Sequence, residues 1–186
     1  MNTFAKRILI GSLTATMLPL IGCERHSKSE QYYLIATNIN LPYWQTANAG
    51  FQEAANQYGV TAIMDGPTSF DLQGEVDAFH SAELKRPAGI LVSVADTRLM
   101  TPEIDSAIAE GIPVITFDSD DTESHRLYFI GTNNLQAGRL GGARVAAQLN
   151  GKGNVVFFTM PEQPNLAERL KGYQDALANS PGVMMT

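Results

Sequence analysis

Four short apolar runs, rich in β-branched side chains, constrain the fold of this chain more than any other feature. Their starts are 28, 29 and 24 residues apart, about the length of one strand, one turn and one helix. The runs are Tyr32–Thr37, Val60–Met64, Gly89–Val94 and Pro113–Phe117. Because a strand that is apolar throughout is typically buried on both faces, the runs predict an α/β fold, a doubly wound parallel sheet with helices on each side.

Helical periodicity fills the intervals between these runs. Apolar side chains recur at steps of three and four residues, as expected for one buried helix face. These residues are Ala47, Phe51, Ala54 and Tyr58, then Leu72, Val76 and Phe79, then Ile104, Ala107 and Ile108. Gly59, Gly89 and Gly111 each stand between a helical pattern and the next strand, where we expect a left-handed C-cap.

A second unit is predicted after Leu127–Ile130. Asn133 or Asn134 can cap a helix that runs through Leu149, and Asn154–Thr159 reads as another buried strand. A last helix carries Leu166, Leu170, Tyr173 and Leu177 on one face. One helix, one strand and one helix cannot close a second doubly wound layer. We therefore expect an N-terminal ligand-binding domain over residues 32–131 and a partial second α/β domain over 132–186, completed by missing sequence or by a partner.

The first residues are predicted to serve targeting. Lys6 and Arg7 precede an apolar stretch, Ile8–Ile21, that is too short to span a bilayer. The following Leu-Ile-Gly-Cys, which ends at Cys23, resembles the lipobox of bacterial lipoproteins. That resemblance implies a signal peptide over residues 1–22, lipidation of Cys23, and a polar tether over residues 23–31. We expect a protein of the periplasm or cell envelope whose only membrane contact is this lipid anchor; an ordinary secretory signal is the alternative.

Charge and cysteine content exclude several classes of protein. The chain has 13 Lys and Arg against 19 Asp and Glu, and it has no basic run, so no nucleic-acid partner is expected. Its single cysteine cannot form a disulfide within the chain. His26, His80 and His125 lack the spacing of metal ligands, and neither a metal nor a cofactor is expected.

Polar and aromatic side chains follow the predicted strands directly. The segments are Asn38–Trp44, Asp65–Thr68, Ala95-Asp96 and Asp118–Asp121. The carboxyl ends of parallel strands meet at one edge of a sheet, which is where such folds bind ligands. Carboxylates and amides hydrogen-bond pairs of hydroxyls, and an aromatic face packs on the C–H face of a sugar ring. The sequence therefore predicts a site for a polyhydroxylated ligand.

Three segments together resemble the type I periplasmic sugar-binding proteins, the ribose-binding-like receptors of ABC importers. They are Asn40–Trp44, Gly111–Asp120 and Tyr128–Gly138, in the order and spacing of that family. The resemblance implies two domains that close over a sugar. It also implies ligand contacts by the rings of Tyr43 and Trp44, by the Asp118 carboxylate, and by Asn134 near the first crossover between domains.

Departures from the ribose receptors indicate a different sugar. Leu41 replaces the usual Asn, Ser119 the usual Arg, and Ala167 a contacting Arg for which Asn165 can substitute. The candidate ligand-binding residues are Tyr43, Trp44, Asp118, Asp120, Asn134, Asn165 and Arg169. Each also has a purely structural interpretation: the aspartates as turn caps, Trp44 as a core anchor, Asn134 as an N-cap and Arg169 as a solvated helix residue.

The predicted function is that of a monomeric, non-enzymatic lipoprotein that binds a monosaccharide or similar polyol and delivers it to an ABC permease. A sugar sensor for a chemoreceptor or sensor kinase fits the same residues. An exported carbohydrate-active enzyme that uses Asp118 and Asp120 as paired carboxylates is a weaker alternative. A repressor of the lactose-repressor type is disfavoured, because the targeting segment occupies the place of its DNA-binding helices.

Overall fold

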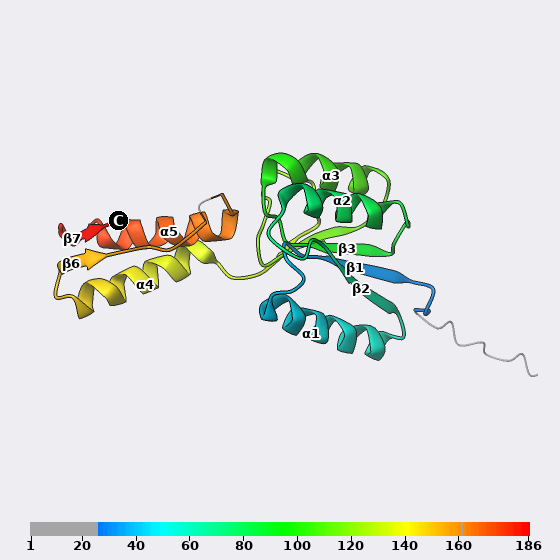
Figure 1. Cartoon of the computed structure of the whole chain (residues 1–186), viewed down its shortest axis with the longest axis horizontal. Helices are drawn as coiled ribbons and strands as arrows, with labels where there is room; N and C mark the ends of the chain where they lie inside the picture. Colours follow the sequence, from blue (N-terminus) through cyan, green and yellow to red (C-terminus); the bar gives the residue numbers. More distant parts are fainter. Residues whose placement is uncertain (1–25, 161) are drawn as a thin grey trace, which may run out of the picture.

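The computed structural model describes residues 26–160 and 162–186, which form two lobes joined at one crossover (Figure 1). The crossover lies between a strand that ends at Ile130 and a helix that begins at Asn134. The predicted signal peptide and Cys23 lie outside the described residues. Within the part of the chain that is described, no helix has the length and apolar character needed to cross a membrane.

The first lobe contains a parallel sheet in the order β2-β1-β3-β4-β5. Its strands are β1 (Gln31–Ile35), β2 (Thr61–Asp65), β3 (Gly89–Val92), β4 (Val114–Phe117) and β5 (Phe129–Ile130). The chain moves outward from β1 to β2 and then returns past β1 to β3, so the winding reverses beside β1. The predicted α/β fold with a parallel sheet is confirmed.

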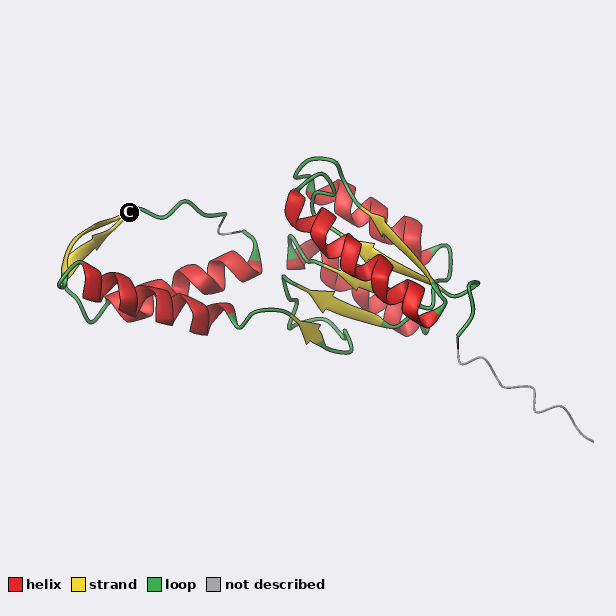
Figure 2. Ribbon diagram, turned by 90° about the horizontal axis from the view of Figure 1, so that it is seen from below, coloured by secondary structure: helices red, strands yellow, loops and turns green. Residues whose placement is uncertain are grey.

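Helices cover both faces of this sheet. Helix α1 (Pro42–Tyr58) lies on one face, and α2 (Leu72–Glu83) and α3 (Thr97–Ala109) lie together on the other (Figures 1 and 2). Successive side chains of β1 point to opposite faces. Leu34 accordingly packs in a cluster with Trp44 of α1, whereas Ile35 packs among α2 and α3 side chains. The continuous apolar run in the sequence is thus explained by burial on both sides.

The expected glycine C-caps are correct at two positions and wrong at one. Gly59 ends α1 with a φ of 69°, and Gly111 follows α3 with a φ of 82°. Gly89 instead begins β3, and the left-handed residue after α2 is Arg86, with a φ of 52°. A Cβ on Gly89 would lie 3.3 Å from the ring of Tyr32. That glycine therefore makes room for a neighbouring aromatic ring rather than for a turn.

The second lobe consists of a close helix pair and a two-stranded parallel sheet. Its elements are α4 (Asn134–Gln148), β6 (Lys152–Val155), α5 (Pro164–Leu177) and β7 (Gly182–Met185). Glycines lie where the helices cross: a Cβ on Gly138 would come within 2.1 Å of the Arg169 carbonyl oxygen, and one on Gly172 within 2.2 Å of that of Leu135. The absence of side chains at these positions lets the two helix backbones touch.

Two sequence predictions for this lobe need correction. The strand expected at Asn154–Thr159 is β6, which begins at Lys152 and ends at Val155, and Phe158 beyond it is 97% exposed. No residue of β6 is fully buried, and Val156 just beyond it is 59% exposed, so this strand is not covered on both faces as its apolar run predicts. The N-cap of α4 is Asn133, whose side chain accepts a hydrogen bond from the Gln136 amide at 2.9 Å, so Asn134 is not the cap.

Candidate functional site

A cavity of about 410 Å³ lies between the two lobes, at the carboxyl ends of β1, β3 and β4. This volume is within the range of ordinary small-molecule sites. The first lobe lines it with Thr37, Asn38, Leu41, Tyr43, Trp44, Phe70, Ser93, Val94, Asp118 and Ser119, and the remaining lining residues are Thr132, Met160, Gln163, Asn165, Leu166 and Arg169. Five of the seven sequence-predicted ligand residues therefore line this cavity: Tyr43, Trp44, Asp118, Asn165 and Arg169.

Asp118 connects the two sides of the cavity. It follows β4 directly and adopts a left-handed φ of 67°, a conformation that Asp tolerates better than most residues. Its Oδ1 accepts a hydrogen bond from the Tyr43 hydroxyl at 2.8 Å, and its Oδ2 accepts one from Nδ2 of Asn165 at 3.1 Å. Tyr43 belongs to α1 and Asn165 to α5, so one carboxylate bridges the lobes.

The two predicted rings differ in how they meet the cavity. The Tyr43 side chain is half exposed, and burial together with its hydrogen bond to Asp118 raises the pKa of its hydroxyl to about 12. Trp44 is only 3% exposed. Its ring lies edge-on to Tyr43 at 5.0 Å and tilted toward Phe117 at 6.2 Å. Trp44 is thus a core residue that also reaches the cavity wall, while Tyr43 is the accessible ring.

Two buried polar atoms of residues that line the cavity have no hydrogen-bond partner among the described residues. They are the Ser119 hydroxyl oxygen, at the end of β4, and Oδ1 of Asn165, in the first turn of α5. Buried polar atoms are nearly always paired, so an unpaired one calls for a physical explanation. A ligand with hydroxyl groups can both donate to the amide oxygen and bond to the serine hydroxyl.

Asn134 lies beside the cavity and positions a residue that lines it. The Asn134 side chain is 2% exposed, and its Oδ1 accepts hydrogen bonds from Nε of Arg169 at 3.0 Å and from Nη2 of the same residue. Its Nδ2 donates to the Thr132 carbonyl oxygen at 3.0 Å, at the crossover between lobes. The structure thus places Asn134 behind Arg169, where it orients the guanidinium.

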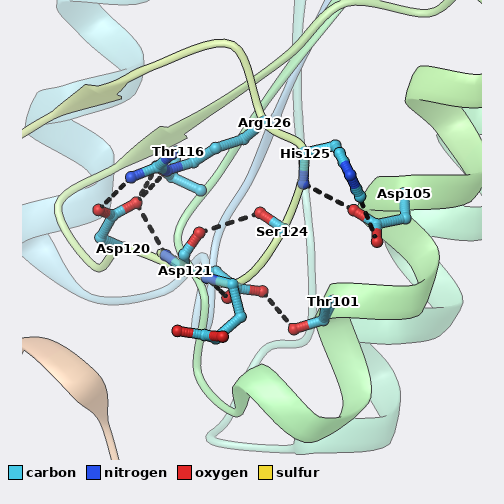
Figure 3. A network of polar contacts seen from close by, with 9 residues as sticks. Thr101, Asp105, Thr116, Asp120, Asp121, Ser124, His125 and Arg126 are labelled. Atoms are coloured by element: carbon cyan, nitrogen blue, oxygen red, sulfur yellow. Dashed lines mark hydrogen bonds and ion pairs between the residues drawn. The ribbon is translucent and has the colours of Figure 1, made fainter.

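Asp120 is not brought to the cavity. Its carboxylate oxygens accept hydrogen bonds from the Arg126 guanidinium, from the Thr116 hydroxyl at 2.5 Å and from the Asp121 amide at 2.8 Å (Figure 3). Burial opposes ionisation, but the hydrogen bonds from Arg126 and Thr116 prevail and hold the pKa of Asp120 below its usual value. Asp120 therefore braces the loop after β4.

Sequence reasoning missed several lining residues. Phe70 places a 46% exposed ring at the cavity, although only the preceding segment, Asp65–Thr68, was singled out. Ser119 belongs to the polar segment Asp118–Asp121 but is not among the predicted ligand-binding residues. A signal was present for Phe70, because an aromatic residue in a loop at the carboxyl end of a strand is a candidate for ligand packing.

A family model described as a periplasmic binding protein domain matches residues 32–185. Solved structures of similar proteins include a sugar-binding protein of a sugar ABC transporter from Bacillus halodurans, at 35% identity and a TM-score of 0.75, with 84% of this chain and 54% of that one covered. A solute-binding protein of an ABC transporter from Burkholderia graminis, in complex with D-arabinose, matches at 29% identity and a TM-score of 0.82, with 87% and 56% covered.

An arabinose-binding protein from Geobacillus stearothermophilus is similar at 31% identity and a TM-score of 0.70, with 84% of this chain and 55% of that protein covered. The chain thus spans about half the length of the solved proteins that it matches. The family match extends over nearly all of the described residues, and the resemblance inferred from the sequence motifs is confirmed. The chain belongs to the family of periplasmic binding protein domains.

Proposed function

We propose that this chain is part of an extracytoplasmic receptor that binds a monosaccharide or similar polyol between its lobes and delivers it to an ABC permease. One observation carries the proposal: the unpaired Ser119 hydroxyl and the unpaired Asn165 amide oxygen belong to opposite lobes, and both residues line the cavity that Asp118 also lines. The ligand class is supported by the similar solved proteins, which include a solute-binding protein in complex with D-arabinose and an arabinose-binding protein.

The groups around the cavity suit a neutral hydroxylated ligand. Asp118 supplies carboxylate oxygens, Asn165 an amide, Ser119 a hydroxyl and Arg169 a guanidinium, while Tyr43 and Phe70 supply exposed rings. A hydrogen bond to a charged group contributes about 1.5–3 kcal/mol. A sugar that pairs several hydroxyls with these groups would therefore bind usefully, and the rings would pack on its C–H face.

Ligand binding would favour a closed arrangement of the lobes. Asp118 and Ser119 lie on the lobe with the five-stranded sheet, and Asn165 and Arg169 lie on α5 of the other. A ligand held by the first pair gains further contacts only when the second pair is near. That differential affinity shifts the population toward closure, which is the state that a permease would recognise.

The cell-envelope location and the partner complete the proposal. Lipidation at Cys23, followed by a short polar tether that ends before β1, would hold a monomeric receptor at the membrane surface. An enzymatic role receives no support from the paired aspartates. A glycosidase needs a carboxyl group with a raised pKa as its general acid, whereas Asp120 has a lowered pKa and an ion pair with Arg126.

Titration with a panel of pentoses and hexoses tests the function. Calorimetry measures binding, and the emission of Trp44, the single tryptophan, reports on the cavity wall. We expect saturable heat and a change in emission for at least one sugar. The affinity should be higher in a longer form of the protein that has the length of the relatives. Asp118→Asn should weaken binding about tenfold or more, since it removes the charge from an acceptor whose hydrogen bonds contribute about 1.5–3 kcal/mol each. Ser119→Ala should weaken binding about threefold to tenfold, since it removes a neutral hydrogen bond of about 0.5–1.5 kcal/mol.

Glu53→Gln, on the exposed side of α1, is the matched control and should bind like the wild type. Failure of every sugar in both forms would overturn the proposal. If the Ser119→Ala and Asp118→Asn variants both bind sugar with the affinity of the wild type, the ligand binds elsewhere. Formation of a new product from an oligosaccharide would instead support the enzymatic alternative.

A further inference from the structure

One histidine and two glutamates meet on the outer helices of the first lobe, apart from the cavity. His80 and Glu83 lie in the last turn of α2, and Glu103 lies on α3. One possible ligand atom from each residue lies within 4.8 Å of the other two. None of the three lines the cavity between the lobes. They form a separate polar cluster where α2 and α3 meet.

Glu83 is the member of this cluster whose environment needs explanation. The residue is 6% exposed, and its Oε1 is buried without a hydrogen-bond partner among the residues that the structure describes. Its Oε2 lies 3.3 Å from Nδ1 of His80. Burying an unpaired carboxylate oxygen is costly, and the nearby carboxylate of Glu103 adds a second negative charge. The single imidazole of His80 cannot both pair with the free oxygen of Glu83 and offset the charge of two carboxylates.

We propose that His80, Glu83 and Glu103 bind a divalent transition-metal ion, for which Zn²⁺ is the probe. One imidazole nitrogen and two carboxylate oxygens are ligands that Zn²⁺ accepts, with water in the fourth position. Ca²⁺ and Mg²⁺ prefer sites made of oxygen alone, so the histidine favours a transition metal. The ion supplies Glu83 with a partner and offsets the charge of both carboxylates.

The three ligand atoms, which lie within 4.8 Å of one another, need to move only slightly closer together to lie about 2.1 Å from one shared ion. His80 and Glu83 are three residues apart, which places them on the same face of α2. The His80 side chain is 58% exposed and Glu103 is partly exposed, so both can rotate toward an ion held at the buried carboxylate. Because the ligands come from two helices, the ion would cross-link α2 to α3 without entering the sugar site.

Calorimetric titration of the chelator-treated chain with ZnCl₂ tests the site, with CaCl₂ and MgCl₂ in parallel. We expect one Zn²⁺ per chain and a melting temperature that rises with Zn²⁺ concentration, because an ion that binds only the folded state stabilises it. His80→Gln and Glu103→Gln should each lower the Zn²⁺ affinity at least about tenfold. His125→Gln and Glu53→Gln, with exposed side chains outside the cluster, are the matched controls and should keep it.

Substitution of Co²⁺ for Zn²⁺ gives a second readout, since a four-coordinate Co²⁺ site with nitrogen and oxygen ligands has visible absorption bands that hexaaqua Co²⁺ lacks at the same intensity. These bands should disappear in the His80→Gln variant. Circular dichroism identifies any variant that is unfolded. If one of the two cluster variants is unfolded, the Zn²⁺ affinity of the other one tests the proposal. Absence of Zn²⁺ binding, wild-type Zn²⁺ affinity in both cluster variants, or an affinity for Ca²⁺ equal to that for Zn²⁺ would overturn the proposal. None of these outcomes depends on whether the cavity binds a sugar.

Discussion

The two lobes support their cavity-facing groups in different ways. In the first lobe Asp118 and Ser119 follow β4, where Val114 and Thr116 are fully buried in a sheet covered on both faces. In the second lobe Asn165 and Arg169 lie in the first turns of α5, which packs on α4 through glycines. The first set is fixed by side-chain burial, and the second by the approach of two helix backbones.

This difference indicates that the two lobes have different roles in ligand binding. A buried sheet holds polar groups at fixed positions, which suits the part of the site that first recognises a ligand. A helix pair that moves as one body suits the part that closes over it. Substitutions that damage one lobe and spare the other test whether the two are independently stable.

The largest effect is expected from the core of the first lobe. Phe79 is fully buried between α2 and the sheet, and Phe79→Ala should lower the free energy of unfolding by about 3–5 kcal/mol, through lost burial and the cavity that remains. Chemical denaturation followed by Trp44 emission reports on this lobe. Phe158→Ala, in a side chain that is 97% exposed, is the control and should change stability by less than about 0.5 kcal/mol. A small effect of Phe79→Ala would mean that the first lobe is not a close-packed unit.

A buried carboxyl group should make the stability of the first lobe depend on pH. Glu75, in the first turn of α2, is 1% exposed; burial raises its pKa to about 8, although the Ala95 amide donates a hydrogen bond to its Oε2 at 3.2 Å. Because the folded-state pKa lies above the unfolded value of 4.5, stability is greatest below pH 4.5 and falls by up to about 1.4 kcal/mol per pH unit until about pH 8.

Glu75→Gln checks this expectation, because the amide keeps an oxygen for the Ala95 hydrogen bond and does not titrate. The free energy of unfolding of the variant should be flatter over that range of pH, and the variant should exceed the wild type in stability above pH 8. Asp77→Asn, on the exposed side of the same helix, provides the comparison and should retain the wild-type slope. Identical slopes for wild type and Glu75→Gln would show that Glu75 does not control the pH dependence.

The sequence predicted the first lobe better than the second, for a physical reason. Strands that are buried on both faces leave uninterrupted apolar runs. The predicted ends of β1, β2, β3 and β4 accordingly differ from the observed ends by no more than about two residues. In the second lobe the apolar run over Val155–Phe158 does not mark the bounds of β6, because no residue of β6 is fully buried and Phe158 is 97% exposed.

Asp120 and Asn134 are the two predicted ligand residues that do not line the cavity, and in both the reason is a distant hydrogen-bond partner. The partner of Asp120, Arg126, lies six residues away across a loop, and the partner of Asn134, Arg169, lies 35 residues away on another helix. Position after a strand predicts that a side chain lies near the sheet edge, but not which neighbour takes up its hydrogen bonds. Asp118 could be identified because its family motif includes the strand that holds it.

The helix pair of the second lobe offers the next test. Gly172→Ala places a methyl group within 2.2 Å of the Leu135 carbonyl oxygen and should force α4 and α5 apart, at a cost of about 1–3 kcal/mol. Circular dichroism should show early loss of part of the helical signal while Trp44 emission stays native. Gly50→Ala, on α1 with open space around it, is the matched control and should stabilise rather than destabilise. Simultaneous loss of both signals would show that the lobes unfold together.

The smallest effect on the stability of the fold concerns the link between the lobes. Asn165→Ala removes the hydrogen bond from Nδ2 to Asp118, which spans the cavity at 3.1 Å and favours the closed arrangement by about 1.5–3 kcal/mol, because its acceptor is charged. Small-angle X-ray scattering should show a larger radius of gyration for the variant without sugar, while its melting temperature changes little. Glu168→Ala, on the exposed side of α5, should leave the radius unchanged. If Asn165→Ala also leaves it unchanged, the lobes are held by the crossover beside Asn134 and not by Asp118, and ligand closure would have to be explained by contacts at that crossover.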